Sequence, residues 1–234
     1  LGVTSIDAVN NGEVDIYAPV GFMEEAISEN VYAGNSMSRR AGFQYGRLIP
    51  SSPFGQVDSA IGKGLSVGAA GLIPPTVVVT DAFEEHTIDG IRVNFQNTPG
   101  TEAPAEMNAW FPDHKVFWAA ENITATIHNV YTLRGALVRD ALAWSKQINA
   151  ALYEFGLDAE VMVSSHNWPR WGNERIQEVM RTQRDAYANL NNQVLNLANQ
   201  GVTINEIHNE YKVPPSLQKQ WSARQYHGSE FHNS

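Results

Sequence analysis

The sequence predicts a mixed α/β fold followed by an all-helical segment. Three observations lead to this prediction. Strand patterns dominate residues 76–120, a long amphipathic helix is expected over residues 132–155, and no strand pattern follows residue 172. Strands that precede a helix and a further strand are typical of layered α/β or α+β proteins. We therefore expect a mixed domain over residues 1–172 and a helical unit over residues 173–234.

The expected strands are short and are bounded by turn residues. They cover residues 14–19, 76–80, 91–96, 107–111, 116–120 and 160–165. Asp89-Gly90 is a strong hairpin signal, and residues 91–96 after it alternate apolar and polar side chains with a period of two. Residues 30–75 are rich in Gly, Ser, Asn and Pro, so we expect a long and mostly irregular loop there.

The expected helices follow apolar stripes with spacings of three and four residues. The stripe of the first helix consists of Leu137, Ala141, Trp144, Ile148, Leu152 and Phe155. Gly156 is expected to end this helix. A second stripe begins at Ile176 and ends at Gly201, and Thr203 with Glu206 forms a capping box for a further helix.

Composition restricts the class of protein. The chain has 234 residues, and 43% of them are hydrophobic, so one domain or slightly more can bury a core. The net charge of −9 leaves no basic stripe for nucleic acid and no attraction to anionic membranes. The absence of cysteine excludes disulfides, thiolate zinc sites and cysteine nucleophiles. No apolar run reaches the ~18 residues of a transmembrane helix.

Two carboxylates and one imidazole form the main candidate site. Glu102 follows a strand and a Thr-Pro-Gly turn, whereas Glu121 and His166 each end a strand. Side chains at strand ends converge on one rim in layered α/β folds. This set of ligands suits zinc or another divalent ion. The alternative interpretation is two solvated glutamates and an ordinary histidine.

Other candidate residues have competing structural explanations. Ser165 beside His166 lacks a Gly-x-Ser-x-Gly elbow, and neighbouring strand residues face opposite sides, which argues against a serine hydrolase. Arg39-Arg40 either binds an anion or forms a solvated face. Arg134 lies at the start of the expected helix, where it either binds an anion or makes an ion pair.

Aromatic and isolated histidine residues are weaker signals. Trp168 and Trp171 either line an apolar pocket or pack in the core, and core packing is the better expectation. His128 and His227 are each isolated, and as sequence features they suggest surface histidines rather than general acids.

Residues 97–108 read NTPGTEAPAEMN and resemble a signature of the alkylsulfatases. This branch of the metallo-β-lactamase superfamily hydrolyses alkyl sulfate esters such as dodecyl sulfate. Further resembling segments are residues 21–26, 33–35, 37–40, 119–122, 128–129, 131–136, 165–173 and 226–229. The segments occur in the family order and cover nearly the whole chain.

The resemblance implies a fold and a domain organisation. Residues 1–172 would form the C-terminal portion of a metallo-β-lactamase-like catalytic domain with an αββα sandwich. Residues 173–234 would begin an all-helical dimerisation domain, so a homodimer is expected. A periplasmic or secreted location is common in the family.

The resemblance also assigns roles in a site with two zinc ions. Glu102 would bind one zinc, Glu121 would bridge both, and His166 would bind the second. His128 is a candidate proton donor to the leaving oxygen. The reaction expected is zinc-dependent hydrolysis of dodecyl sulfate-like esters to an alcohol and inorganic sulfate.

The resemblance assigns the sulfate contacts to three further residues. Thr132 and Arg134 match positions that contact the sulfate, and His227 matches a residue near it, which makes His227 a candidate for substrate binding and catalysis. Three alternatives stay open: a secondary alkylsulfatase, another ester hydrolase on the same scaffold such as a phosphoesterase, and a non-catalytic amphiphile-binding or assembly module.

One feature of the family pattern is missing. The family uses a His-x-His-x-Asp-His run for its remaining zinc ligands, and none of the seven histidines here forms that run. We expect the run upstream of Leu1 and a further C-terminal domain beyond residue 234. The chain is thus expected to be a piece of a longer protein with part of a two-metal site.

Overall fold

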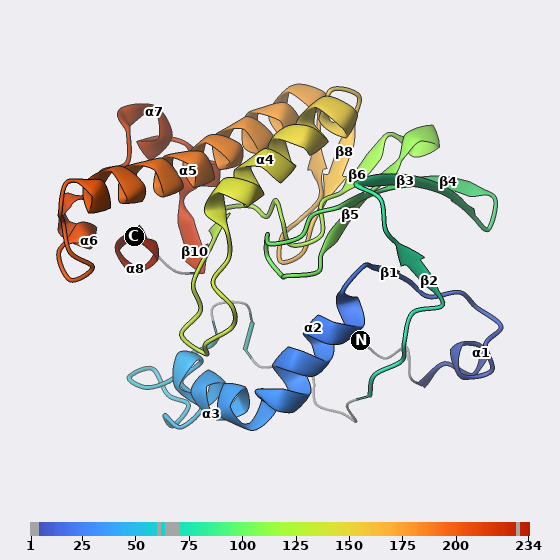
Figure 1. The fold of residues 1–234 in the computed structure, drawn as a ribbon, viewed down its shortest axis with the longest axis horizontal. Coiled ribbons are helices and arrows are strands. Elements are labelled where there is room, and N and C mark those ends of the chain that lie inside the picture. The colour runs from blue at the N-terminus through green and yellow to red at the C-terminus, as the bar shows by residue number, and fades with distance from the viewer. Residues whose placement is uncertain (1–4, 60–61, 64–70, 228–229) are drawn as a thin grey trace.

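The structure, a computed structural model, describes residues 5–59, 62–63, 71–227 and 230–234 (Figure 1). Its centre is a six-stranded mixed sheet with the strand order β3-β4-β5-β6-β8-β9. These strands are β3 (Phe83–Ile88), β4 (Ile91–Asn97), β5 (Met107–Phe111), β6 (Val116–Trp118), β8 (Val161–Val163) and β9 (Arg170–Trp171). Two parallel pairs lie outside it: β1 (Tyr17–Pro19) with β2 (Val77–Val79), and β7 (Ile127–His128) with β10 (Gln225–His227).

Strand directions determine where the candidate site lies. β4 and β5 are antiparallel, β5 and β6 are antiparallel, and β6 and β8 are parallel. Therefore β4, β6 and β8 all run in one direction, and their carboxyl ends share one edge of the sheet. The predicted Asp89-Gly90 hairpin is confirmed: both residues have positive φ, 50° and 78°, between β3 and β4.

Two long helices cover one face of the sheet (Figure 1). The helices of the described chain are α1 (Asp7–Asn10), α2 (Phe22–Ile27), α3 (Gly34–Gln44), α4 (Ala141–Ala151), α5 (Asn173–Asn199), α6 (Ile207–Glu210), α7 (Pro215–Gln218) and α8 (Glu230–Asn233). Single π-helical turns extend α2 and α4 over Ser28–Tyr32 and Leu152–Gly156, and 3₁₀ turns cover Pro112–His114 and Trp221–Ala223. No helix among the described residues is long and apolar enough to cross a bilayer.

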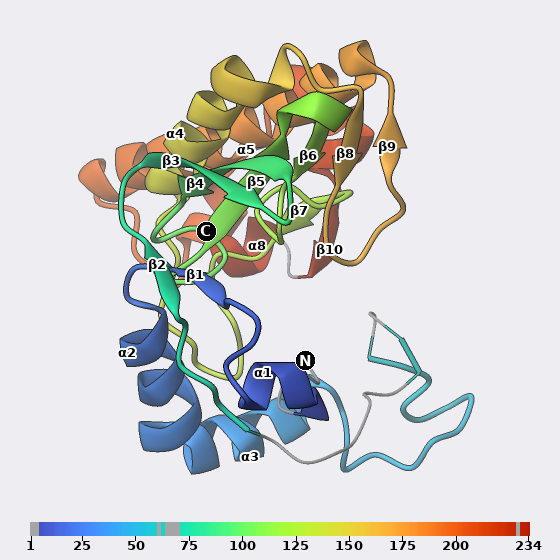
Figure 2. The same ribbon diagram turned by 90° about the vertical axis from the view of Figure 1, so that its right-hand side faces the viewer.

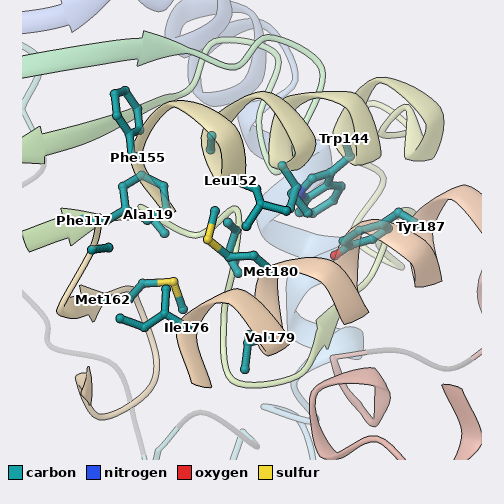
Figure 3. Packing of buried hydrophobic residues seen from close by; sticks show 14 of the residues in the cluster. Phe117, Ala119, Trp144, Leu152, Phe155, Met162, Ile176, Val179, Met180 and Tyr187 are labelled. Carbon is teal, nitrogen blue, oxygen red and sulfur yellow. The ribbon is translucent and has the colours of Figure 1, made fainter. Parts of the chain in front are cut away.

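The main core lies between the sheet and helices α4 and α5 (Figure 3). Trp144 of α4 stacks on Tyr187 of α5, with ring centroids 4.3 Å apart and an interplanar angle of 14°. Both rings are almost fully buried, and such a pair adds about 0.5–1.5 kcal/mol beyond area burial. The core is continuous across residue 172, and the domain boundary proposed there stays a prediction.

Alternation along the strands separates this core from a smaller one. In β5, Trp110 faces α4, whereas Ala109 faces a second cluster with Val79, Val93 and Phe95. The β1–β2 pair lies against that second face and leads to α2 and α3 (Figure 2). The predicted α/β class is confirmed.

The predicted helix over residues 132–155 is wrong at its start. Helix α4 begins at Ala141, and the Asp140 carboxylate caps it by accepting a hydrogen bond from the Ala143 amide at 2.9 Å. Gly135 cannot belong to the predicted helix, because its φ of +86° lies outside the helical range. A Cβ at this position would lie 2.8 Å from the Arg40 guanidinium carbon. Arg134 therefore lies in a loop and not at a helix N-terminus.

The predicted irregular loop over residues 30–75 is also wrong in part. Helix α3 occupies Gly34–Gln44 within it, and only Ala41 of this helix is buried. A helix with so little buried surface leaves no apolar stripe for sequence reasoning to detect. Residues 60–61 and 64–70 of this range lie outside the described residues.

Candidate metal centre

The predicted meeting of strand ends occurs in the structure. β6 and β8 continue pairing beyond their ends, because the Ala119 amide donates to the Val163 carbonyl and the Ser165 amide donates to the Ala120 carbonyl, both at 2.8 Å. Glu121 and His166 follow directly, and the His166 Nε2 atom lies 3.0 Å from the Glu121 Oε1 atom. Their roles as metal ligands stay predictions.

His128 joins this pair from β7. Its Nε2 atom lies 3.1 Å from Glu121 Oε1 and 3.9 Å from Glu102 Oε1, and its side chain is 3% exposed. Its Nδ1 atom lies 3.0 Å from the Asn129 carbonyl oxygen, to which it donates. This arrangement directs Nε2 at the carboxylates, as in histidines that bind metals through one ring nitrogen and donate from the other. Sequence reasoning expected an isolated surface residue, whereas His128 is buried.

These donors fit a divalent cation. One ligand atom from each of Glu102, Glu121 and His128 lies within 4.8 Å of the other two. Zinc binds nitrogen and oxygen at about 2.0–2.1 Å, so two ligands of one tetrahedral ion lie about 3.4 Å apart. The distances of 3.0–3.9 Å around Glu121 and Glu102 match that spacing. Two carboxylates and imidazoles are also the donor types that zinc accepts.

Two carboxyl groups of this region have shifted pKa values. Burial raises the pKa of Glu121, but the hydrogen bond and charge of His128 and the charge of His166 outweigh it and hold this pKa below its usual range. Burial raises the pKa of Glu106 to about 7, and the nearby Glu102 and Glu121 charges add to the shift. Glu106 lies within residues 97–108, the segment that carries the family resemblance, but the sequence did not identify it as a candidate site residue.

A buried amide network connects the two carboxylate-bearing segments. The Asn122 amide nitrogen donates to Thr98 Oγ1 at 3.0 Å and to Asn108 Oδ1 at 2.9 Å. The Glu102 backbone amide donates to Asn122 Oδ1 at 3.4 Å. The Asn108 amide continues the network by donating to Gln96 Oε1 at 3.0 Å. Strand β4, strand β5 and the turn with Glu102 are therefore held to the segment with Glu121.

Thr132 and Arg134 lie in one turn after β7. Thr132 is buried, and its Oγ1 atom accepts a hydrogen bond from the Ala136 amide at 3.0 Å. The Arg134 Nη2 atom lies 3.4 Å from Glu29 Oε1, and its backbone amide donates to Gln44 Oε1 at 2.7 Å. Arg134 thus makes the ion pair that was its alternative explanation, and its sulfate role stays a prediction.

The remaining candidates are placed differently. β10 brings the His227 backbone beside the backbone of His128, because these two residues are paired in the β7–β10 ladder. The core packing expected for Trp168 and Trp171 is wrong, since their exposed fractions are 87% and 62%. Trp168 lies in the loop between β8 and β9, and Trp171 lies on β9 at the edge of the sheet.

Comparisons with known proteins agree on one family of enzymes. No family model matches this chain. It is 46% identical over 232 residues to a linear primary-alkylsulfatase of Pseudomonas sp., covering 99% of this chain and 34% of that protein. It is 44% identical over 232 residues to the alkyl/aryl-sulfatase BDS1 of Saccharomyces cerevisiae, covering 99% of this chain and 36% of that protein.

A solved structure gives the same result. The stereoselective inverting sec-alkylsulfatase Pisa1 from Pseudomonas sp. superimposes with a TM-score of 0.92 at 43% identity, covering 97% of this chain and 37% of that chain. The chain spans about a third of the length of the curated relatives that it matches.

Proposed function

Because the chain belongs to the alkylsulfatase branch of the metallo-β-lactamase superfamily, we propose that the full protein hydrolyses alkyl sulfate esters with two zinc ions. The observation that carries this proposal is the convergence of Glu102, Glu121 and His128, with His166 against Glu121. The ligands that complete a two-metal site would come from a part of the protein outside residues 1–234.

The residues of this chain would have separate roles in binding the metal ions and the sulfate group. Glu102, Glu121 and His166 would hold the metal ions, which when bound supply Lewis acidity and a nucleophile at neutral pH. Arg134 and Thr132 would orient the sulfate group through charge and hydrogen bonds, with His227 beside them. For Arg134 this requires the sulfate to compete with Glu29, which now lies 3.4 Å away.

His128 has two candidate roles, as a metal ligand and as the proton donor to the leaving alcohol oxygen. Its distances of 3.1 and 3.9 Å to the two carboxylates support the first role, and the ability of an imidazole nitrogen to carry and donate a proton supports the second. A His128→Gln variant of the full-length protein separates them. Loss of bound zinc would identify a ligand. Retained zinc, with activity surviving only on esters whose alcohol leaves readily without a proton, would identify the donor.

The function is tested with the full-length protein and dodecyl sulfate. Inorganic sulfate release that a chelator abolishes and added zinc restores would support the proposal. Release that is insensitive to the chelator, or absent from zinc-loaded protein with every alkyl sulfate tried, would overturn it.

The Glu121→Ala variant tests the site itself. Removing the carboxylate that contacts both His128 and His166 should reduce sulfate release at least about 1,000-fold, because both metal ions would lose the ligand that they share. Circular dichroism should show a retained fold. Glu160→Ala is the matched control, since the Glu160 side chain is exposed and its carboxylate pairs with Lys115. Turnover near wild type in the Glu121 variant would remove the bridging assignment.

A second candidate is the hydrolysis of secondary alkyl sulfates. The likeness to the inverting sec-alkylsulfatase Pisa1 at a TM-score of 0.92 supports it. Hydrolysis of a chiral secondary alkyl sulfate in ¹⁸O-water shows whether the C–O bond or the S–O bond of the ester breaks. Label in the alcohol with inverted configuration would support a secondary alkylsulfatase, and turnover restricted to linear primary esters would exclude it.

We also propose that the protein forms a homodimer through its helical part. Leu195 near the end of α5 is 57% exposed, and Ile204 after α5 is 84% exposed, which supports an apolar surface in this part of the chain. Light scattering of the full-length protein tests this, and a Leu195→Glu, Ile204→Glu variant should dissociate. A dimer unaffected by both changes would place the interface elsewhere.

A further inference from the structure

Arg139 is a buried cation beside the candidate metal centre. It lies at the end of the loop between β7 and α4, and its side chain is 4% exposed. Its Nη2 atom donates to Glu102 Oε1, and its Nε atom donates to the Glu102 backbone carbonyl. Its Nη1 atom donates to Asn129 Oδ1 at 2.6 Å and to the Asn129 carbonyl at 3.3 Å.

These bonds use four of the five guanidinium N–H groups on two segments of the site. Glu102 belongs to the turn after β4, and Asn129 follows His128 directly. The Arg139 backbone is also fixed, because its amide donates to the Val130 carbonyl at 2.9 Å and the next amide, of Asp140, donates to the Gly100 carbonyl at 3.1 Å. One residue therefore sets the separation between the Glu102 carboxylate and the backbone that carries His128.

The contacts also select one carboxylate oxygen. Both Arg139 and His128 approach the Oε1 atom of Glu102. An Arg fork that engages Oε1 and the backbone carbonyl of the same residue fixes the rotamer of that side chain. The positive charge also offsets the repulsion among Glu102, Glu106 and Glu121, and it lowers the cost of gathering three carboxyl groups in one partly buried place.

We propose that Arg139 is the positioning residue of the metal centre: it orients Glu102 toward the cation and holds it at a fixed distance from His128. This inference rests on the metal-dependent function proposed above. Arg139 itself would touch neither the cation nor the sulfate ester. Groups that orient a metal ligand typically contribute about 10- to 100-fold to metal affinity.

The experiment measures zinc affinity, separately from catalysis. Arg139→Lys in the full-length protein keeps the charge but loses the planar fork, so it should weaken zinc binding about 10-fold or more in competition with a chromogenic chelator. It should also lower kcat for dodecyl sulfate with little change in KM. In combination with Glu102→Gln, the Arg139 substitution should add little further loss, because it acts through Glu102.

Arg184→Lys is the matched control. Arg184 on α5 also binds an acid and an asparagine, since its Nε donates to Asp185 Oδ1 at 2.7 Å and its Nη1 to Asn149 Oδ1 at 3.0 Å. The control should leave zinc affinity unchanged. Wild-type zinc affinity in folded Arg139→Lys protein, or an equal loss in the control, would overturn the inference.

A second variant tests the positioning role of Arg139 if the Arg139→Lys protein does not fold. Asn129→Ala removes the Oδ1 acceptor at 2.6 Å and leaves Glu102 and Arg139 in place. Weaker zinc binding in this variant would support the inference, and unchanged binding would overturn it. Zinc binding without sulfate release by the wild type would overturn the proposed function alone, whereas absence of zinc binding by the wild type would overturn both.

Discussion

Tyr187 joins helix α5 to the strand that carries His128. Its hydroxyl accepts a hydrogen bond from the His128 amide and donates to the His128 carbonyl, both at 3.1 Å. The Tyr187 ring is 1% exposed, so burial raises the pKa of its hydroxyl and keeps it protonated. A neutral hydroxyl is thus available as donor and acceptor at every working pH.

Tyr187→Phe should lower the free energy of unfolding by about 1–3 kcal/mol, because two buried backbone groups of His128 lose their partner. Urea denaturation of the full-length protein measures this. Tyr32→Phe is the control, since Tyr32 is 89% exposed and should change stability by less than about 0.5 kcal/mol. Equal midpoints for the two variants would contradict the expectation.

Glu106 gives a pH dependence of stability. Its pKa of about 7 lies above the ordinary value of 4.5, so the folded state binds the proton more tightly than the unfolded state. Its contribution is fully present below pH 4.5 and is lost as the pH rises through about 7. In metal-free protein, this loss should be on the order of 3 kcal/mol.

Glu106→Gln keeps the shape and removes the titration. Denaturation of chelator-treated protein between pH 4.5 and 8 should therefore show a smaller decrease in the variant than in the wild type. Parallel pH profiles for the two proteins would show that Glu106 titrates normally.

At the scale of residues, sequence reasoning could find only part of the site. Glu121 and His166 were predictable as neighbours because both follow strands, and parallel strand ends meet at one edge. Arg139 carried no local signal, because its acid partner lies 37 positions earlier in the chain. His128 was misjudged as isolated, since the strand pairing that buries it joins residues far apart in sequence.

At the scale of elements, local chemistry decides which boundaries are predictable. The Asp89-Gly90 hairpin is encoded by two residues with positive φ and was found directly. The start of α4 was misplaced because Leu137 is apolar but 66% exposed, so it extends the helical stripe without being buried. The capping residue Asp140 was the better boundary signal.

Asp140→Ala should lower the free energy of unfolding by about 1 kcal/mol, because the Ala143 amide at the start of α4 loses its acceptor. Thermal or urea denaturation measures the change. Asp140→Asn is the matched comparison, since asparagine also caps helices and should retain most of the stability. Two variants that are equally destabilised would show that the charge, and not the cap, is what matters.

At the scale of the whole molecule, zinc and stability should be linked. The ligand atoms of Glu102, Glu121 and His128 lie within 4.8 Å of one another, so a bound cation would add to the positive charge that Arg139 already places beside the carboxylates. A cation present at 100 times its dissociation constant stabilises a folded protein by about 2.7 kcal/mol. Chelation should therefore lower the Tm of the full-length protein, and added zinc should restore it.

Glu121→Ala should abolish most of this zinc-dependent change in Tm. Glu84→Ala provides the comparison, because Glu84 lies on β3 and pairs with His86 at 2.7 Å rather than with the cluster. An equal response to zinc in both variants would place the stabilising ion elsewhere in the protein.

The architecture of the whole molecule was predictable as a class but not as a packing arrangement. Strands first, then a helix and a further strand indicated α/β organisation, and the sheet with α4 and α5 confirms it. The sequence alone did not reveal that α5 shares the core of the sheet, because an amphipathic stripe does not identify its partner surface.

The hydrogen bonds between Tyr187 of α5 and His128 of β7 have a consequence for the order of folding during synthesis. His128 leaves the ribosome 59 residues before Tyr187, which later satisfies its backbone groups. Chains emerge from the N-terminus onward, so the sheet and its carboxylates exist before the helix that braces them. The donor set therefore acquires its shape only after α5 has been made, and tight binding of a cation would report that α5 has docked.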